Sequence, residues 1–143
     1  MSIWFAEPSV AAINAFSKNT LAEHLGIEIT AVGDDFLTAT MPVDQRTVQP
    51  YGLLHGGASV VLAETLGSIA AILCVNSEEK MCVGLEINAN HVRAARSGYV
   101  TGTTRPIHIG GSTQIWQTQI HDEKERLVCI SRLTIAVLDR KDK

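Results

Sequence analysis

The segment 49–75 constrains the fold of this chain more than any other. It opens with a turn at Pro50–Tyr51–Gly52, passes through His55–Gly56–Gly57, and then becomes a long apolar run. This run predicts one helix of roughly eighteen residues, about 27 Å long at the usual helical rise. Because apolar side chains occur all round it, we expect a helix of the protein core.

A single ionisable residue, Glu64, interrupts this helix. Carboxylates are almost never fully buried unless they are paired or take part in chemistry. The residues alone leave two interpretations open: Glu64 is catalytic, or it forms a structural ion pair with an arginine such as Arg132. The helix is long enough to span a membrane, but Glu64 and its polar neighbours Thr65 and Ser68 argue against a membrane span.

The rest of the chain predicts an α+β fold with a mainly antiparallel sheet. At 143 residues we expect a single domain, 1–143. A short amphipathic helix starts at Pro8, and a helical turn at 21–25 ends at Gly26. Strands are predicted by their β-branched and aromatic residues and by the turns between them, at 27–31, 36–43, 81–93, 99–107, 113–121 and 127–138.

Composition excludes several classes of function. With a net charge of −3 and no basic stripe, we do not expect a nucleic-acid partner. The three cysteines lie in separate apolar stretches without CxxC spacing, and no HExxH occurs, so we expect reduced thiols and no metal. The N-terminus lacks the pattern of a signal peptide, and a cytoplasmic location is expected.

Three stretches carry a resemblance to a known family: QPYGLLHGGASVVLAETLGS at 49–68, VGLEINANHVR at 83–93 and RPIHIGGSTQIWQ at 105–117. They resemble the hotdog-fold acyl-CoA thioesterases, in the group related to 4-hydroxybenzoyl-CoA and phenylacetate-pathway thioesterases. Within that group the likeness is greatest to hydrolases of 1,4-dihydroxy-2-naphthoyl-CoA in menaquinone synthesis and to thioesterases that proofread aryl carrier proteins in enterobactin synthesis. The resemblance extends over 25–138.

The resemblance implies a fold and an assembly. In such enzymes a curved antiparallel sheet wraps the long helix, and two subunits join their sheets so that the active site straddles the contact. It therefore implies a homodimer as the active unit, with a tetramer expected. It implies an acyl-CoA or aryl-CoA substrate and no cofactor, because CoA is part of the substrate.

The resemblance also assigns roles to individual residues. Glu64 becomes the catalytic carboxylate, and the amide of Gly56, beside His55, polarises the thioester carbonyl. Gln49 positions substrate and water, and Ser68 supports Glu64. The stretches that match the CoA-binding segments are Gly84; His91, Val92, Arg93 and Ala94; and His108, Ile109, Gly110, Gly111, Ser112 and Thr113.

One departure from the family concerns the turn after His108. Relatives commonly carry an arginine there, whereas this chain has Gly110–Gly111–Ser112–Thr113. Backbone amides of a glycine turn can still bind a phosphate. The departure puts affinity for the nucleotide end of CoA in doubt, and it leaves room for a carrier-protein substrate, whose phosphopantetheine arm has no nucleotide.

Helix geometry indicates how the site is assembled. Gly56 lies at a helix N-terminus, where free amides favour a developing negative charge. Glu64 lies eight residues further on, about 12 Å along the axis. If both groups act on one carbonyl, they must come from two subunits. Glu64 then attacks the carbonyl directly or removes a proton from water, and the sequence leaves both routes open.

Each assignment has a structural alternative. His55 could act only as a helix cap, and Ser68 could bond its own backbone. The polar run Asn88–His91 could be a strand end beside a ligand or a β-bulge. We expect phosphate-binding groups around two strand ends. A solvated surface could carry the same side chains, which are those of Arg93, Arg96, Arg105, His91 and His108.

The sequence leaves three alternatives to CoA-thioester hydrolysis to compare. A proofreading thioesterase would act on aryl or acyl carrier proteins. A hotdog dehydratase or hydratase needs a paired histidine and acid at one carbon, and its Asp-to-His motif is absent. A non-catalytic acyl-CoA-binding module would retain binding after replacement of Glu64, with no turnover to lose.

Overall fold

The structure is a computed structural model that describes residues 1–141. The elements along the chain are α1 (Val10–Phe16), α2 (Leu21–His24), β1 (Glu28–Val32), β2 (Leu37–Pro42), α3 (Gly56–Leu73), β3 (Lys80–His91), β4 (Tyr99–Ile109), β5 (Thr113–His121) and β6 (Leu127–Asp139). Their order matches the order predicted from the sequence. Most bounds differ from the predicted ones by one or two residues.

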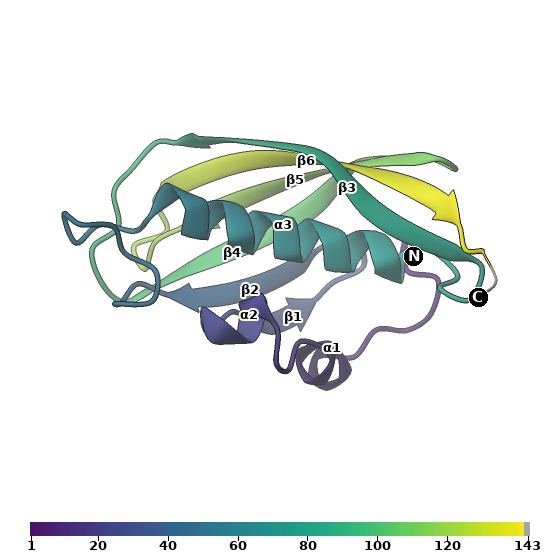
Figure 1. The fold of residues 1–143 in the computed structure, drawn as a ribbon, viewed down its shortest axis with the longest axis horizontal. Helices are drawn as coiled ribbons and strands as arrows, with labels where there is room; N and C mark the ends of the chain where they lie inside the picture. Colours follow the sequence, from purple (N-terminus) through teal and green to yellow (C-terminus); the bar gives the residue numbers. More distant parts are fainter. Residues whose placement is uncertain (142–143) are drawn as a thin grey trace.

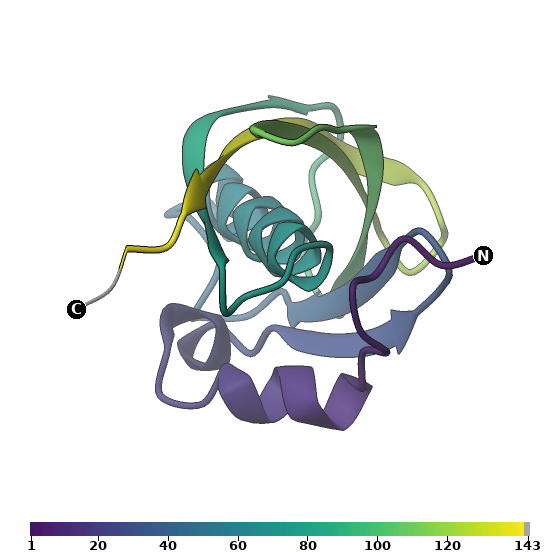
Figure 2. The ribbon, with the colours of Figure 1, turned by 90° about the vertical axis from the view of Figure 1, so that its right-hand side faces the viewer.

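One six-stranded sheet wraps α3 (Figures 1 and 2). Its strand order is β1-β2-β4-β5-β6-β3, and every neighbouring pair is antiparallel. The view along α3 shows the sheet curling round the helix, with α1 and α2 lying below β1 and β2 (Figure 2). This is the hotdog arrangement that the resemblance implied.

The sheet and α3 approach each other closely at two glycines, which place no side chain between them. A Cβ built on Gly67 of α3 would lie 2.6 Å from Leu133 of β6. A Cβ built on Gly102 of β4 would lie 2.9 Å from Leu66 of the helix. Since Leu66 is fully buried and Leu133 nearly so, these glycines allow the apolar face of α3 to seat directly on the sheet.

The other side of α3 is less buried than predicted. Eight of its eighteen residues are buried, and the remaining side chains lie mostly along a stripe spaced by three and four residues. We call this the open stripe: Val60, Val61, Glu64, Thr65, Ser68, Ile69 and Ile72. The expectation of burial all round is therefore wrong for the single chain, because the sheet wraps only part of the helix.

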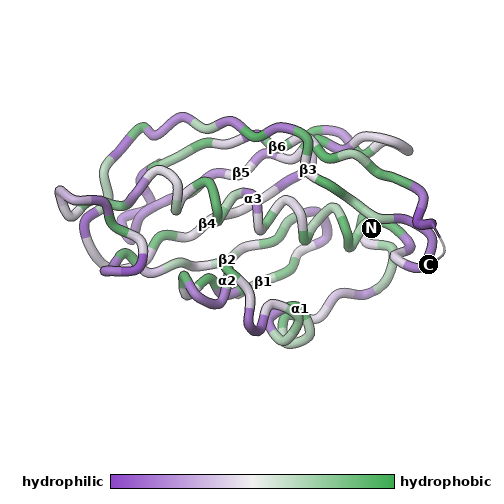
Figure 3. Tube along the Cα trace, viewed as in Figure 1, coloured by the Kyte–Doolittle hydropathy of each residue, from purple (hydrophilic) through white to green (hydrophobic). Residues whose placement is uncertain are grey.

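By length and composition alone, α3 would also qualify as a membrane-spanning helix. It is instead the helix that the sheet wraps, and 44% of its residues are buried inside the chain. Core helices pass the same test of length and apolarity. The strands around it alternate between apolar and polar residues (Figure 3), and β5 shows the corresponding alternation of buried and more exposed positions.

Strand β3 forms one edge of the sheet over twelve residues. Its irregularity lies between Gly84 and Glu86, not at the polar run that ends in His91. The bulge interpretation of 88–91 is therefore wrong, and the strand ends there instead. Strand β4 continues two residues beyond the predicted end at 107, so that His108 and Ile109 belong to the strand.

The N-terminal segment packs against the sheet and is held there by side-chain contacts. Trp4 stacks on Trp116 of β5 with 6.4 Å between ring centroids, and its Nε1 donates to the Gly33 carbonyl at 2.8 Å. Ser9 caps α1, so Pro8 precedes the cap and does not begin the helix. Asn14 of α1 bonds both the N–H and the C=O of Ile29, which fastens α1 to strand β1.

Candidate active site

The loop before α3 is fixed to the body of the protein at both ends. Thr47 is buried, its hydroxyl donates to the Pro42 carbonyl at 2.7 Å, and its own carbonyl accepts from the N–H of His55 at 2.8 Å. The N–H of Leu54 donates to the Ala95 carbonyl at 2.8 Å. The start of α3 is consequently held in a defined position.

His55 and Gly56 form the start of the helix itself. His55 is the N-cap, and its Nδ1 accepts from the N–H of Gly57 at 2.8 Å. The capping interpretation of His55 is confirmed, and this bond places the ring proton of a neutral His55 on Nε2. Gly56 is the first helical residue, so its N–H has no carbonyl partner within the helix.

The ring of His91, at the end of β3, packs against Gly56. A Cβ built on Gly56 would lie 2.9 Å from Nε2 of His91, and so glycine leaves the room that the imidazole occupies. The two residues share a cavity of about 400 Å³. It is lined by Gln49, Leu53, Leu54, Gly56, Ser59, His91, Val92, Arg93, Ala94 and Val128.

This cavity unites many of the predicted site residues. Gln49, Gly56 and the stretch 91–94 all line it, although they are far apart in sequence. Gln49 accepts a hydrogen bond from the N–H of Tyr51. Sequence reasoning missed Leu53, Ser59 and Val128. Val128 lines the cavity because its carbonyl accepts a hydrogen bond from the N–H of Val92 at 2.8 Å. This contact joins the end of β3 to the start of β6, and no local sequence pattern indicates it.

Glu64 lies apart from this cavity, in the middle of the open stripe. Its Oε2 is 2.7 Å from the point that a Cβ on Gly84 of β3 would occupy. Within residues 1–141, no hydrogen bond or ion pair involves its carboxylate. Arg132 is exposed between the buried residues Ser131 and Leu133, so it points away from the helix. The structural ion pair with Arg132 is therefore wrong.

Ser68 is half-buried one turn after Glu64. Over the described part of the chain, its hydroxyl makes no hydrogen bond to Glu64 or to the helix backbone. Its supporting role stays a prediction.

The second predicted CoA-binding stretch lies at the opposite end of the sheet. In the turn 108–113, the N–H of Gly110 donates to the Thr113 carbonyl and the N–H of Val137 donates to the Ser112 carbonyl, both at 2.9 Å. Val137 pairs with Cys82 near the start of β3, whereas His91 is the last residue of that strand. One chain therefore does not bring the two stretches together.

Arg105 does not join a phosphate-binding cluster. Its guanidinium donates to Asp35 at 3.0 Å and lies 4.6 Å from the ring centroid of Phe36. These two contacts hold Arg105 to the hairpin between β1 and β2. The predicted cluster of arginines and histidines is thus not formed within one chain.

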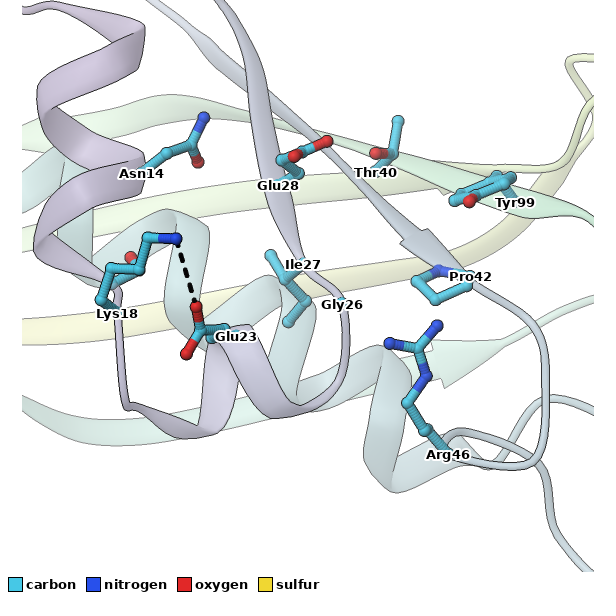
Figure 4. Close-up of a pocket in the computed structure, with 11 residues that line it drawn as sticks. Asn14, Lys18, Glu23, Gly26, Ile27, Glu28, Thr40, Pro42, Arg46 and Tyr99 are labelled. Carbon is cyan, nitrogen blue, oxygen red and sulfur yellow. Dashed lines mark ion pairs between the residues drawn. The ribbon is translucent and has the colours of Figure 1, made fainter.

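A second cavity, of about 350 Å³, lies between the N-terminal helices and strands β1 and β2 (Figure 4). Lys18 and Glu23, which both line it, form an ion pair at 3.6 Å (Figure 4). Arg46 also lines it and pairs with Asp44 at 2.6 Å. None of the predicted site residues lines it. Among residues 1–141, no cluster of three or more metal-ligating side chains is present.

Comparison with known proteins decides the family. The family model described as the thioesterase superfamily matches residues 51–129, which include Glu64, Gly56 and His91. The chain belongs to this thioesterase superfamily. The thioesterase is 56% identical to the 1,4-dihydroxy-2-naphthoyl-CoA hydrolase of Escherichia coli, over 95% of this chain and 99% of that protein.

Two further relatives extend the comparison. A proofreading thioesterase, EntH, of Cronobacter turicensis is 53% identical over 95% of this chain and 98% of its own. The crystal structure of a variant thioesterase from Pseudomonas aeruginosa has a TM-score of 0.96 at 50% identity, covering 97% of this chain and 100% of that one. These likenesses establish a thioester hydrolase with the hotdog fold.

Proposed function

We propose that this thioesterase hydrolyses aryl-CoA or acyl-CoA thioesters to the free acid and CoA, with 1,4-dihydroxy-2-naphthoyl-CoA or a similar aroyl-CoA as its substrate. The observation that carries the proposal is the Glu64 carboxylate, which has no hydrogen-bond or ion-pair partner among residues 1–141 and lies on an otherwise uncharged stripe of α3. The E. coli relative named for this reaction supports the choice of acyl group and suggests a place in menaquinone synthesis. A cytoplasmic location is part of the proposal. The reaction requires no cofactor, because CoA enters with the substrate.

The proposed mechanism uses two groups, the N–H of Gly56 at the start of α3 and the carboxylate of Glu64 in its middle. The N–H of Gly56 at the helix N-terminus donates to the thioester oxygen and stabilises the charge that develops on it. Glu64 either attacks the carbonyl carbon to form an anhydride, which water then opens, or removes a proton from the attacking water. On both routes the C–S bond breaks, and the CoA sulfur leaves and takes up a proton.

The proposed active unit is a homodimer. Glu64 and Gly56 of one chain lie about 12 Å apart along α3, too far to act on one carbonyl. Strand β3 is a long exposed edge, and Leu85 on it is 63% exposed. Antiparallel pairing of two β3 edges would bring Glu64 and Gly84 of one subunit towards Gly56 and His91 of the other. We propose that such dimers associate further into a tetramer.

The same dimer accounts for the separated CoA-binding stretches. Because the two-fold axis reverses the direction of β3, the turn 108–113 of one subunit would approach the stretch 91–94 of the other. The phosphates of CoA would then meet Arg93 and the amides of the glycine turn.

A carrier-protein substrate is the second candidate. The glycine turn Gly110–Gly111, where relatives carry an arginine, suits a phosphopantetheine arm that lacks the nucleotide. The proofreading relative from Cronobacter supports this candidate. Comparing kcat/KM on one aroyl group carried by CoA and by an aryl carrier protein separates the two.

Steady-state hydrolysis of benzoyl-, 4-hydroxybenzoyl-, 1,4-dihydroxy-2-naphthoyl- and hexanoyl-CoA tests the proposal. Glu64→Gln should lower kcat by roughly 10²–10⁴-fold, the usual range for a general base. Glu78→Gln is the matched control, because Glu78 is an exposed carboxylate in the turn after α3, outside the proposed β3 contact. Unchanged turnover in Glu64→Gln would show that Glu64 is not the catalytic carboxylate. Binding of these thioesters without turnover by the wild type would indicate a non-catalytic acyl-CoA-binding module and contradict the proposal.

A further inference from the structure

The imidazole of His91 lies beside the N–H that polarises the thioester in the proposed mechanism. Strand β3 ends at His91, on the side of the molecule where α3 begins (Figure 1). Nε2 of His91 would lie 2.9 Å, and Cε1 3.2 Å, from a Cβ on Gly56, so this edge of the ring faces the first helical residue. A thioester whose oxygen accepts from the Gly56 N–H therefore has the Nε2 edge of the imidazole next to it.

The order of the residues along the cavity places His91 where the sulfur of the substrate must lie. In the proposed complex the carbonyl is held at Gly56, and the phosphates of CoA meet Arg93, two residues after His91. The sulfur is bonded to the carbonyl carbon and leads into the CoA arm, so it lies between these two points. All three residues line the same cavity.

His91 is also the one lining side chain that can supply a proton. Among the described residues that line this cavity, only His91 and Arg93 carry ionisable side chains. Arginine keeps its proton in proteins, whereas histidine ordinarily gives and takes up a proton near neutral pH. Within residues 1–141 the His91 ring makes no hydrogen bond or ion pair, so Nε2 is not committed to another group. His55 does not line the cavity, and its Nδ1 already accepts from Gly57.

The chemistry of the leaving group explains why a proton is needed there. When Glu64 attacks the carbonyl, the tetrahedral intermediate can expel either the thiolate or the Glu64 carboxylate. Carboxylic acids are stronger acids than alkane thiols by about four orders of magnitude, so an unassisted intermediate returns to the thioester. A proton delivered to the sulfur removes this disadvantage, because the group that leaves is then a neutral thiol.

We propose that His91 is the general acid of this thioesterase and protonates the sulfur of the leaving thiol. The inference rests on the proposed hydrolysis at Gly56 and Glu64. The electron pair of the C–S bond goes to sulfur, the Nε2 proton of the imidazolium moves to the same atom, and the carbonyl forms again as the thiol departs. The water that opens the anhydride then gives its proton to the neutral imidazole, which restores the imidazolium, releases the acid and frees Glu64 as a carboxylate.

His91→Gln tests this, because an amide donates hydrogen bonds but has no proton to transfer near neutral pH. The substrates are the benzoyl thioesters of three thiols: CoA, N-acetylcysteamine, which is an alkane thiol without the nucleotide, and 4-nitrothiophenol, which is far more acidic. His24→Gln is the matched control, since His24 is exposed on α2 and lines neither of the cavities described above. The quantity measured is kcat/KM, which covers the steps up to departure of the thiol.

The expected loss depends on the thiol. His91→Gln should lower kcat/KM by roughly 10²–10⁴-fold on the CoA and N-acetylcysteamine thioesters, the usual contribution of a general acid. On the 4-nitrothiophenol thioester the loss should be about threefold or less, because a more acidic thiol leaves faster without a proton. That thioester also shows that the variant is folded and its Glu64 active. His24→Gln should match the wild type on all three.

Three results would overturn the inference and leave the proposed function standing. An equal loss on all three thioesters would mean that His91 acts through Glu64 or the carbonyl and not on the sulfur. A loss confined to benzoyl-CoA would mean that His91 only binds the CoA arm, and no loss would mean that it has no part in turnover. If the wild type hydrolyses none of the three thioesters, the proposed function fails and the inference fails with it.

Discussion

The two ends of the candidate site use glycine in opposite ways. At the start of α3, glycine is on the helix, and Gly56 leaves room for the ring of His91 from β3. In the middle of α3, glycine is on the strand, and Gly84 leaves room for the carboxylate of Glu64 from the helix. The first end offers a backbone N–H donor beside a cavity lined by both polar and apolar residues, whereas the second offers a carboxylate that pairs with no group within residues 1–141. In the proposed mechanism, each end supplies one of the two groups that act on the thioester carbonyl.

The largest effect is expected from removing the N–H at the first end. Gly56→Pro deletes the N–H at the first helical position, where proline fits the backbone and where the preceding His55 is already extended (φ −68°, ψ 131°). Loss of one oxyanion donor should lower kcat by roughly 10²–10³-fold. Gly56→Ala is the control, since it adds the same Cβ against His91 but keeps the N–H. Equal kinetics in the two variants would show that the N–H has no role.

A side chain at the second end should displace the carboxylate. The Cβ of Gly84→Ala would lie 2.7 Å from Oε2 of Glu64, so the carboxylate must move. Because a shift of about 1 Å can cost on the order of 10²-fold, we expect kcat to fall by about 10- to 100-fold. Thermal unfolding of the variant should resemble that of the wild type, because only the flexible end of Glu64 is displaced. An unchanged kcat would mean that the placement of Glu64 against β3 is irrelevant to turnover.

A smaller effect is expected at Arg93, the residue of the first end that we propose binds a phosphate of CoA. Arg93 lines the cavity beside His91, and a charge-assisted bond to a phosphate is worth about 1.5 kcal/mol or more. Arg93→Ala should therefore raise KM for CoA thioesters by about tenfold or more, with little change for the matching pantetheine thioester. Arg105→Ala should leave KM unaltered, because Arg105 is held by Asp35 and Phe36.

The smallest effect on activity concerns the three thiols: Cys74 and Cys82 lie beyond the second end, and Cys129 pairs with His91 across the sheet at the first end. Burial, with a contribution from nearby Cys82, raises the pKa of the Cys74 thiol to about 11, and burial raises the pKa of Cys82 and Cys129. These thiols stay protonated at neutral pH, so iodoacetamide should leave activity intact at pH 7–8.

The same raised pKa has a consequence for stability. An acid whose folded pKa lies above its unfolded value of 9.0 binds more protons in the folded state. The free energy of unfolding should therefore be unaffected by Cys74 below pH 9 and should fall as pH rises from 9 towards 11. Cys74→Ala should reduce that fall, as measured by urea unfolding at a series of pH values. An unaltered pH dependence would contradict the assignment to Cys74.

The sequence predicts features that depend on local pattern. The length of α3, the order of the elements along the chain and the capping of the helix by His55 all follow from residues close together in the sequence. The open stripe was mispredicted because apolar composition does not show which side of a helix the sheet covers. The contacts of Gly56 with His91 and of Glu64 with Gly84 depend on the register of β3 against α3, which no local pattern fixes.

The central claim is that one active site takes Glu64 from one subunit and Gly56 from the other. Mixing two inactive variants, Glu64→Gln and Gly56→Pro, after dissociation and reassociation tests it directly. Half of the dimers in an equal mixture are mixed, and each mixed dimer would hold one intact site, so activity should return to about one quarter of the wild-type value. If the mixture is no more active than the separate variants, the site belongs to a single chain and the account is wrong.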